Sequence, residues 1–347
     1  MTLLDFRLTD TNAIPLDGLI SHVGDTPLLP LRSVTLRHAQ GGALNLSPRV
    51  KVFIKAEWFN PGGSVKDRPA LNIIQNALIN GDLLPSLSFA KHPCGTAAGT
   101  LPRARYKRLL DSTSGNMGIS YATFGAALGI PVTFAIPASA SPERLTLLRA
   151  LGAEVVLTDP SEGSDGAILK AREMVEKTPD RYWYANQYNN PANWQAHYLS
   201  TGPEILAQTN GQVTHFIAGL GTSGTLMGTG KYLREHLQNV KILAFQPDAP
   251  FHGLEGLKHM PSAIKPGIYD ESLAGEPLAV KTEAAYAMVS RLAREEGLFV
   301  GISSGAAAVA ALQVASQLEE GVVVTIFPDA GYKYLSDKSL WDSDHRR

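Results

Sequence analysis

The chain has 347 residues, enough for one large or two medium domains. Its hydrophobic fraction of 44%, charged fraction of 18% and formal net charge of -1 are typical of a globular enzyme and predict no nucleic-acid-binding surface. Because Cys94 is the single cysteine, an intramolecular disulfide and a multi-cysteine metal site are both excluded. We expect a cytoplasmic protein, because the sequence shows no signal-peptide pattern and no apolar run of membrane-spanning length.

The first recognisable unit is a strand, a Gly-rich loop and a helix. Residues 52–57 alternate in polarity as a strand does, and residues 69–79 have helical apolar spacing. Between them, residues 60–68 read NPGGSVKDR. A helix N-terminus is a poor place for a cation, so we expect a lowered pKa for Lys66, as in lysines that form Schiff bases. The alternative is a solvated loop lysine beside Asp67.

Residues 83–110 show no clear secondary-structure period. They mix Pro, Gly and a basic cluster, and a long structureless loop inside a compact domain is unusual. We interpret the stretch as a surface insertion near residues 88–108.

Strands and helices alternate through the rest of the chain, which predicts parallel sheets covered on both faces. After the sequence STSGNMG at 112–118, the expected helices are 119–128, 142–151, 165–177, 195–208, one after residue 224, 282–297 and 305–318. The expected strands are 131–137, 154–157, 182–184, 213–218, 241–247 and 322–327. The fold class is therefore α/β.

The sequence GLGTSG at 219–224 follows a strand and opens a helix. Glycines let a backbone approach a phosphate, and a helix N-terminus holds the anion. A nicotinamide cofactor would also need an acidic residue after the next strand, for which Asp248 is a weak candidate. A glycine turn used only for close packing is the structural alternative.

Two further polar turns could hold ligand groups. Residues 113–116, TSGN, offer hydroxyl and N–H groups suited to a carboxylate, and Ser303 or Ser304 could face a ring nitrogen. Both turns could equally be ordinary helix N-caps. A metal site has little support, because His252, His259 and the other histidines show no ligand spacing.

Taken together and in this order, these loops resemble the cysteine synthase/cystathionine β-synthase family, which consists of pyridoxal 5′-phosphate (PLP) enzymes of fold type II. The matching motifs are residues 60–68, 113–116, 221–225 and 301–305, with further matches at 187–193, 201–204 and 328–336. The run 214–236 is most similar to the cysteine synthase B branch. The resemblance covers roughly residues 17–337 apart from the insertion.

The resemblance implies a role for each matching residue. Lys66 would carry PLP as a Schiff base and act as the catalytic base, Asn116 would hydrogen-bond the pyridoxal 3′ oxygen, and Ser303 would face the pyridine nitrogen. The phosphate would be held by Gly221, Thr222, Ser223, Gly224 and Thr225. The substrate carboxylate would be surrounded by Thr113, Ser114, Asn116, Met117 and Gln187. Met117 departs from the family, which usually has Thr there.

The family fold implies two three-layer αβα domains with mostly parallel sheets and PLP in the cleft between them. Residues 1–58 and 195–341 would form the larger, PLP-binding domain, and 59–194 the smaller, substrate-binding domain with the insertion. Residues 342–347 would be a polar tail. A homodimer is also implied, with no nucleic-acid or membrane partner.

The implied function is a cysteine synthase that replaces the β-substituent of an activated L-serine, O-acetyl-L-serine or O-phospho-L-serine, by sulfide or another sulfur donor. A cation at Lys258 would favour the phosphoserine, although we rather expect a solvated loop lysine at this position. Within the family, the alternative is cystathionine β-synthase. From other classes, the alternatives are a nicotinamide-dependent oxidoreductase and a family member that its insertion has disabled.

Overall fold

The computed structural model describes residues 18–34, 46–84, 107–113 and 115–341. It contains a six-stranded and a four-stranded sheet. The larger sheet has the order β1 (Leu28–Pro30), β2 (Val50–Ala56), β10 (Gly321–Phe327), β7 (His215–Gly219), β8 (Lys241–Pro247) and β9 (Leu278–Val280). The smaller has the order β5 (Glu154–Thr158), β4 (Val132–Pro137), β3 (Arg108–Ser112) and β6 (Tyr182–Tyr184). All strand pairs are parallel except β1 with β2.

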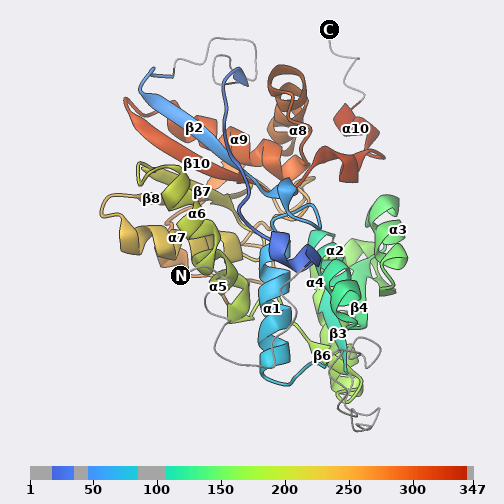
Figure 1. The fold of residues 1–347 in the computed structure, drawn as a ribbon. Helices are drawn as coiled ribbons and strands as arrows, with labels where there is room; N and C mark the ends of the chain where they lie inside the picture. Colours follow the sequence, from blue (N-terminus) through green and yellow to red (C-terminus); the bar gives the residue numbers. More distant parts are fainter. Residues whose placement is uncertain (1–17, 35–45, 85–106, 114, 342–347) are drawn as a thin grey trace.

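Helices cover both sheets (Figure 1). They are α1 (Asp67–Ile79), α2 (Asn116–Leu128), α3 (Pro142–Ala150), α4 (Gly163–Lys177), α5 (Pro191–Leu199), α6 (Thr201–Gln208), α7 (Gly224–His236), α8 (Thr282–Arg291), α9 (Ile302–Ala315) and α10 (Lys338–Trp341). The 3₁₀ helix η10 (Gly331–Tyr334) follows the last strand. Among the described residues, no helix is both long and apolar enough to cross a bilayer.

Each sheet has an apolar core on both faces. In the larger sheet, one core includes Ile54 of β2 together with α8 and α9, and the other includes Phe216 of β7 together with α7. In the smaller sheet, one core joins Phe134 of β4 to α1 and α2, and the other joins Leu110 of β3 to α4. This is the expected pair of three-layer αβα units, because each sheet buries both faces against helices.

Several elements differ from the sequence-based prediction. Strand β3 was not predicted, and β9 was not predicted either. The helix expected over 195–208 is two helices, α5 and α6, which meet at Ser200. The helix expected over 282–297 ends as α8 at Arg291 and continues as a π-helical turn, Leu292–Glu296. Helix α9 begins at Ile302, so Ser303 and Ser304 lie in its first turn and do not form a separate turn before it.

The proposed domain boundaries remain a prediction. All strands of the larger sheet fall within 1–58 and 195–341, and all strands of the smaller sheet fall within 59–194. The predicted insertion lies outside the described residues up to 106, while Arg108 is the first residue of β3 and pairs with Tyr182. The predicted tail, 342–347, also lies outside the described residues.

A buried ionic cluster joins α1 to the larger sheet. Arg68, which is 1% exposed, pairs with Glu57 through Nε at 2.8 Å and with Glu204 through Nη1 at 2.6 Å. Lys55 Nζ lies 2.5 Å from Glu204 and also donates to the carbonyl of Thr26. Burial opposes the charge of Arg68, but the two glutamates raise its pKa above the ordinary value. The cluster therefore holds two cations and two anions that depend on one another for solvation.

We predict that Arg68→Met destabilises the protein strongly, because it leaves Glu57 and Glu204 short of a counter-charge. Removing one partner of a buried pair costs about 3–5 kcal/mol. The measurement is the urea-unfolding midpoint. The matched control is Arg49→Met, whose ion pair with Glu320 is 65% and 73% exposed, and which should cost less than about 1 kcal/mol. Equal midpoints for the two variants would contradict the prediction.

Candidate active site

A cavity of about 680 Å³ lies where loops from both sheets meet. Loops that follow β3, β4, β7 and β8 contribute to it, as expected where parallel strands end. The residues named from the sequence that line it are Lys66, Thr113, Asn116, Met117, Gln187, Gly221, Thr222, Ser223, Thr225 and Ser303. Gly224 is the first residue of α7 beside this loop, and Ser114 lies outside the described residues.

Lys66 immediately precedes α1 and faces the cavity. The loop before it is held by Asp67, whose carboxylate accepts a hydrogen bond from the N–H of Gly62 at 2.5 Å. Burial lowers the pKa of Lys66 from 10.5 to about 8, and the charges of Asp329 and Glu57 limit this fall. A lysine with such a pKa is a far better nucleophile and base near neutral pH than a solvated one.

The glycine loop between β7 and α7 is packed so tightly that side chains are excluded. A Cβ on Gly221 would lie 2.3 Å from the carbonyl oxygen of Gly256, and one on Gly224 would lie 1.9 Å from Asn193 Oδ1. Ser223 adopts the left-handed conformation, with φ of 67°. The loop thus presents backbone N–H groups at the start of α7, which is an arrangement that binds phosphate.

In the polar loop before α2, some of the backbone N–H groups find hydrogen-bond acceptors within the loop itself. Thr113 Oγ1 accepts hydrogen bonds from the N–H groups of Gly115 and Gly118, at 3.0 and 3.1 Å. Thr113 therefore serves the helix N-terminus as a cap, the structural alternative raised for this turn. Gln187 is buried beside it and donates through Nε2 to the carbonyl of Ser112 at 2.6 Å.

Asp111 lies behind both of these loops. Its carboxylate accepts from the N–H of Ser112 at 2.9 Å and from the N–H of Gln187 at 3.3 Å. Burial raises its pKa to about 7, and these backbone hydrogen bonds oppose the rise. Asp111 thereby ties the loop that carries Thr113 to the loop that carries Gln187.

The two serine candidates on α9 differ in position. Ser303 lines the cavity, whereas Ser304 is fully buried and its Oγ has no hydrogen-bond partner in the described structure. Gly301, just before them, donates its N–H to the carbonyl of Asp329 at 3.1 Å. Ser303 therefore stays the predicted partner of the ring nitrogen.

Two residues near the site were not singled out from the sequence. Asn116 donates through Nδ2 to Asp329 Oδ2 at 2.8 Å and accepts through Oδ1 from Lys333 Nζ at 2.9 Å. Both partners lie in residues 328–336, a motif that the resemblance included without a role. The only sequence signal was an acidic and a basic residue around a glycine after the last strand.

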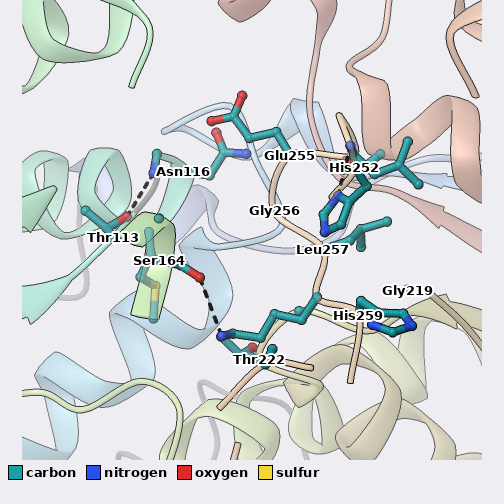
Figure 2. A pocket seen from close by; sticks show the side chains of 18 of the residues that line it. Thr113, Asn116, Ser164, Gly219, Thr222, His252, Glu255, Gly256, Leu257 and His259 are labelled. Carbon is teal, nitrogen blue, oxygen red and sulfur yellow. Dashed lines mark hydrogen bonds between the residues drawn. The ribbon is translucent and has the colours of Figure 1, made fainter. Parts of the chain in front are cut away.

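Ion pairs cross the cavity between the two halves of the molecule. Lys258 Nζ lies 2.7 Å from Asp165 of α4 and 5.1 Å from the ring centre of Tyr188, and Arg144 of α3 pairs with Glu255. Figure 2 shows Thr113 and Asn116 on one side of the pocket, with Glu255 and its neighbours on the other. The prediction of a solvated Lys258 is therefore wrong, because that residue is only 5% exposed.

Within the described ranges, no group of His, Cys, Asp or Glu side chains forms a metal site.

Comparison with known proteins identifies the family. The model of the family described as "Pyridoxal-phosphate dependent enzyme" matches residues 19–329. The chain belongs to this family. A cysteine synthase of Aquifex aeolicus is 46% identical over 332 residues, which are 94% of this chain and 93% of that protein. A cysteine synthase B of Pseudomonas aeruginosa is 37% identical over 316 residues, or 90% of this chain and 94% of that protein.

Comparison with a solved structure leads to the same family. The crystal structure of a cysteine synthase from Entamoeba histolytica has a TM-score of 0.81 and 31% identity, and covers 96% of this chain and 93% of that one. The resemblance read from the motifs and the type II fold are therefore confirmed. The nicotinamide alternative is wrong, because the glycine loop belongs to a PLP enzyme.

The residues of this cavity fit the family's cofactor, pyridoxal 5′-phosphate. A Cβ on Gly221 or Gly224 would collide with Gly256 or Asn193, so both positions keep a bare backbone, as in loops that bind phosphate. Lys66, with its lowered pKa, lines the same cavity as this loop and as Ser303. Lys66 offers an amine to the aldehyde of PLP, the glycine loop offers an anion site to its phosphate, and Ser303 offers a hydroxyl to its ring nitrogen.

We predict that the free energy of unfolding of the cofactor-free protein depends on pH through the titration of Lys66. The folded pKa of about 8 lies below the unfolded value of 10.5, so unfolding takes up a proton between these pH values. The cost of burying the charged amine is therefore full below pH 8 and is lost as the pH rises towards 10.5. Lys66→Met removes this cost, roughly 1–3 kcal/mol at neutral pH.

The measurement is urea unfolding of cofactor-free wild type and Lys66→Met across this pH range. The advantage of the variant should shrink as the pH rises, whatever constant offset the methionine adds. Parallel pH profiles would show that Lys66 is not the shifted group.

Proposed function

We propose that this protein is a cysteine synthase that converts O-acetyl-L-serine and sulfide into L-cysteine and acetate. The observation that carries the proposal is the placement of Lys66, with its lowered pKa, on the same cavity as the α7 glycine loop. The names of the relatives support the reaction class.

The residues of the cavity would have different roles in this reaction. Bound PLP would supply an electron sink for negative charge at the substrate Cα. Lys66 Nζ would hold the cofactor, remove the Cα proton of the substrate and return it to the product. The N–H groups of residues 221–225 would hold the phosphate, and the Oγ of Ser303 would face the ring nitrogen. A hydroxyl does not force that nitrogen to be protonated, which favours β-replacement over transamination.

The substrate carboxylate would be bound by the loop that includes Thr113, Ser114, Asn116 and Met117, and by Gln187. Gln187 is well placed for this, because its amide is anchored to Ser112 and its backbone to Asp111. Met117, which is 3% exposed and lines the cavity, cannot donate a hydrogen bond. Backbone N–H groups at the start of α2 must replace the hydroxyl that the family usually has there.

The alternative within the family is cystathionine β-synthase. It differs in the incoming thiol, an amino-acid thiol in place of sulfide, so a direct comparison of the two thiols decides between them. A member disabled by its insertion would show neither reaction.

We predict that the purified, PLP-loaded protein forms L-cysteine from O-acetyl-L-serine and sulfide, faster than it forms cystathionine from homocysteine. Lys66→Ala should lower kcat by at least about 10²–10⁴-fold, as expected when a general base is lost. The control is Lys51→Ala, at an exposed position on β2. Wild-type protein that takes up no PLP, or that releases no cysteine, would sink the proposal.

For the leaving group we propose acetate over phosphate. Lys258 is a cation of the cavity that could bind a phosphate, but Asp165 already pairs with it at 2.7 Å. An ammonium held in this way offers little net charge to an incoming dianion.

We predict that Asp165→Asn shifts the preference towards O-phospho-L-serine, because it frees the ammonium of Lys258. The measurement is the ratio of kcat/KM for the phospho and acetyl substrates. It should rise severalfold in Asp165→Asn and fall back in Asp165→Asn/Lys258→Met. A ratio that stays constant across the three proteins would show that Lys258 does not meet the leaving group.

We also propose a homodimer that acts in the cytoplasm. The resemblance supports the dimer, and a chain with one cysteine, Cys94, fits a reducing compartment. Light scattering that gives the mass of a single chain would refute the dimer.

A further inference from the structure

We propose that Asp329 and Lys333 are positioning residues that fix the orientation of the Asn116 amide towards the cofactor. The inference rests on the proposed function, since it concerns how Asn116 meets the 3′ oxygen of PLP. It assigns a task to two buried charged side chains that the chemistry above does not use.

The hydrogen bonds leave the amide of Asn116 one orientation. A lysine ammonium can only donate, so Lys333 must face Oδ1, at 2.9 Å. A carboxylate accepts, so Asp329 Oδ2 faces Nδ2, at 2.8 Å. If the amide were rotated by 180°, each partner would face a group of its own kind. Asp329 and Lys333 therefore determine on which side of the Asn116 amide its nitrogen lies.

This orientation is the one that the cofactor needs. The amide nitrogen carries two hydrogens, and Asp329 takes one of them. Asn116 lines the cavity, so the remaining N–H is available to an oxygen acceptor there, such as the 3′ oxygen of PLP. With the amide reversed, Oδ1 would face that oxygen, and two acceptors would repel.

Asp329 and Lys333 are themselves rigidly held. Asp329 is fully buried, and its Oδ2 also accepts from Tyr334 Oη at 2.8 Å. Its Oδ1 would lie 2.1 Å from a Cβ on Gly301, so only glycine fits at that position. Lys333 is 6% exposed and donates to the carbonyl of Gly63 at 3.0 Å.

The same segment also touches the other two loops of the site. Val65, next to Lys66, donates its N–H to the carbonyl of Pro328 at 2.9 Å, and Gly301, before Ser303, donates to the carbonyl of Asp329 at 3.1 Å. Residues 328–334 therefore fix the position of Asn116 relative to Lys66 on one side and to Ser303 on the other.

The test is a double-mutant cycle on PLP affinity. Cofactor-free Asp329→Asn and Lys333→Met should each bind PLP roughly ten- to hundredfold more weakly than wild type, the loss expected for a charge-assisted hydrogen bond. If they act through Asn116, then Asp329→Asn/Asn116→Ala should be no weaker than Asn116→Ala alone. Lys333→Arg, which keeps donors, should restore most of the affinity.

A second readout is the visible absorbance spectrum of the PLP-loaded proteins, which reports hydrogen bonding at the 3′ oxygen. Asp329→Asn and Lys333→Met should shift it as Asn116→Ala does. The matched controls are the exposed substitutions Asp180→Asn and Lys51→Met, which should change neither affinity nor spectrum.

The outcomes separate the two proposals. If wild type binds no PLP, the proposed function fails. If wild type binds PLP but the losses of Asp329→Asn and Asn116→Ala add in full, or the spectra do not shift, the positioning role is refuted and the function stands.

Discussion

The site depends on the pairing of buried charges directly behind the reactive lysine. Arg68 has no exposed side-chain surface, and its bonds to Glu57 and Glu204 hold the first turn of α1 to the 3₁₀ turn Glu57–Phe59 after β2 and to helix α6. A buried guanidinium without these partners would cost far more than any loop contact returns. The position of Lys66, two residues earlier, is therefore set by a constraint that does not involve PLP.

Much of the fold could be predicted from the sequence, because period and turn chemistry are local. The strand over 52–57, the helix after Lys66 and the α7 glycine loop follow from spacing alone. Strand β3 could not be predicted, because Leu109, Leu110 and Asp111 are too short a run to show alternation and follow a stretch without a period. The break at Ser200 was missed because apolar spacing continues across it.

The site could be predicted only as a set of candidate loops. The motifs and the resemblance indicated Lys66, Asn116 and Ser303, and the N-cap alternative raised for residues 113–116 agrees with the bonds of Thr113. They did not indicate that Asp165 pairs with Lys258, because that contact joins residues 93 positions apart in the chain. The partners of Asn116 were missed for the same reason: Asp329 and Lys333 lie more than 200 residues away, at separations of 213 and 217. Nothing in local composition distinguishes them from solvated charges.

The charge state of Lys66 follows from the same arrangement. Burial alone would drive its pKa far down, while Asp329 and Glu57 oppose this and leave it at about 8. Glu57 is shared with Arg68, and Asp329 is shared with Asn116 and Tyr334. Each anion near the lysine is therefore already partly committed to a neighbour. An additional, unshared carboxylate would raise the pKa of Lys66 further and make its neutral amine scarcer near neutral pH. The shared anions therefore limit the fall in its pKa without cancelling the effect of burial.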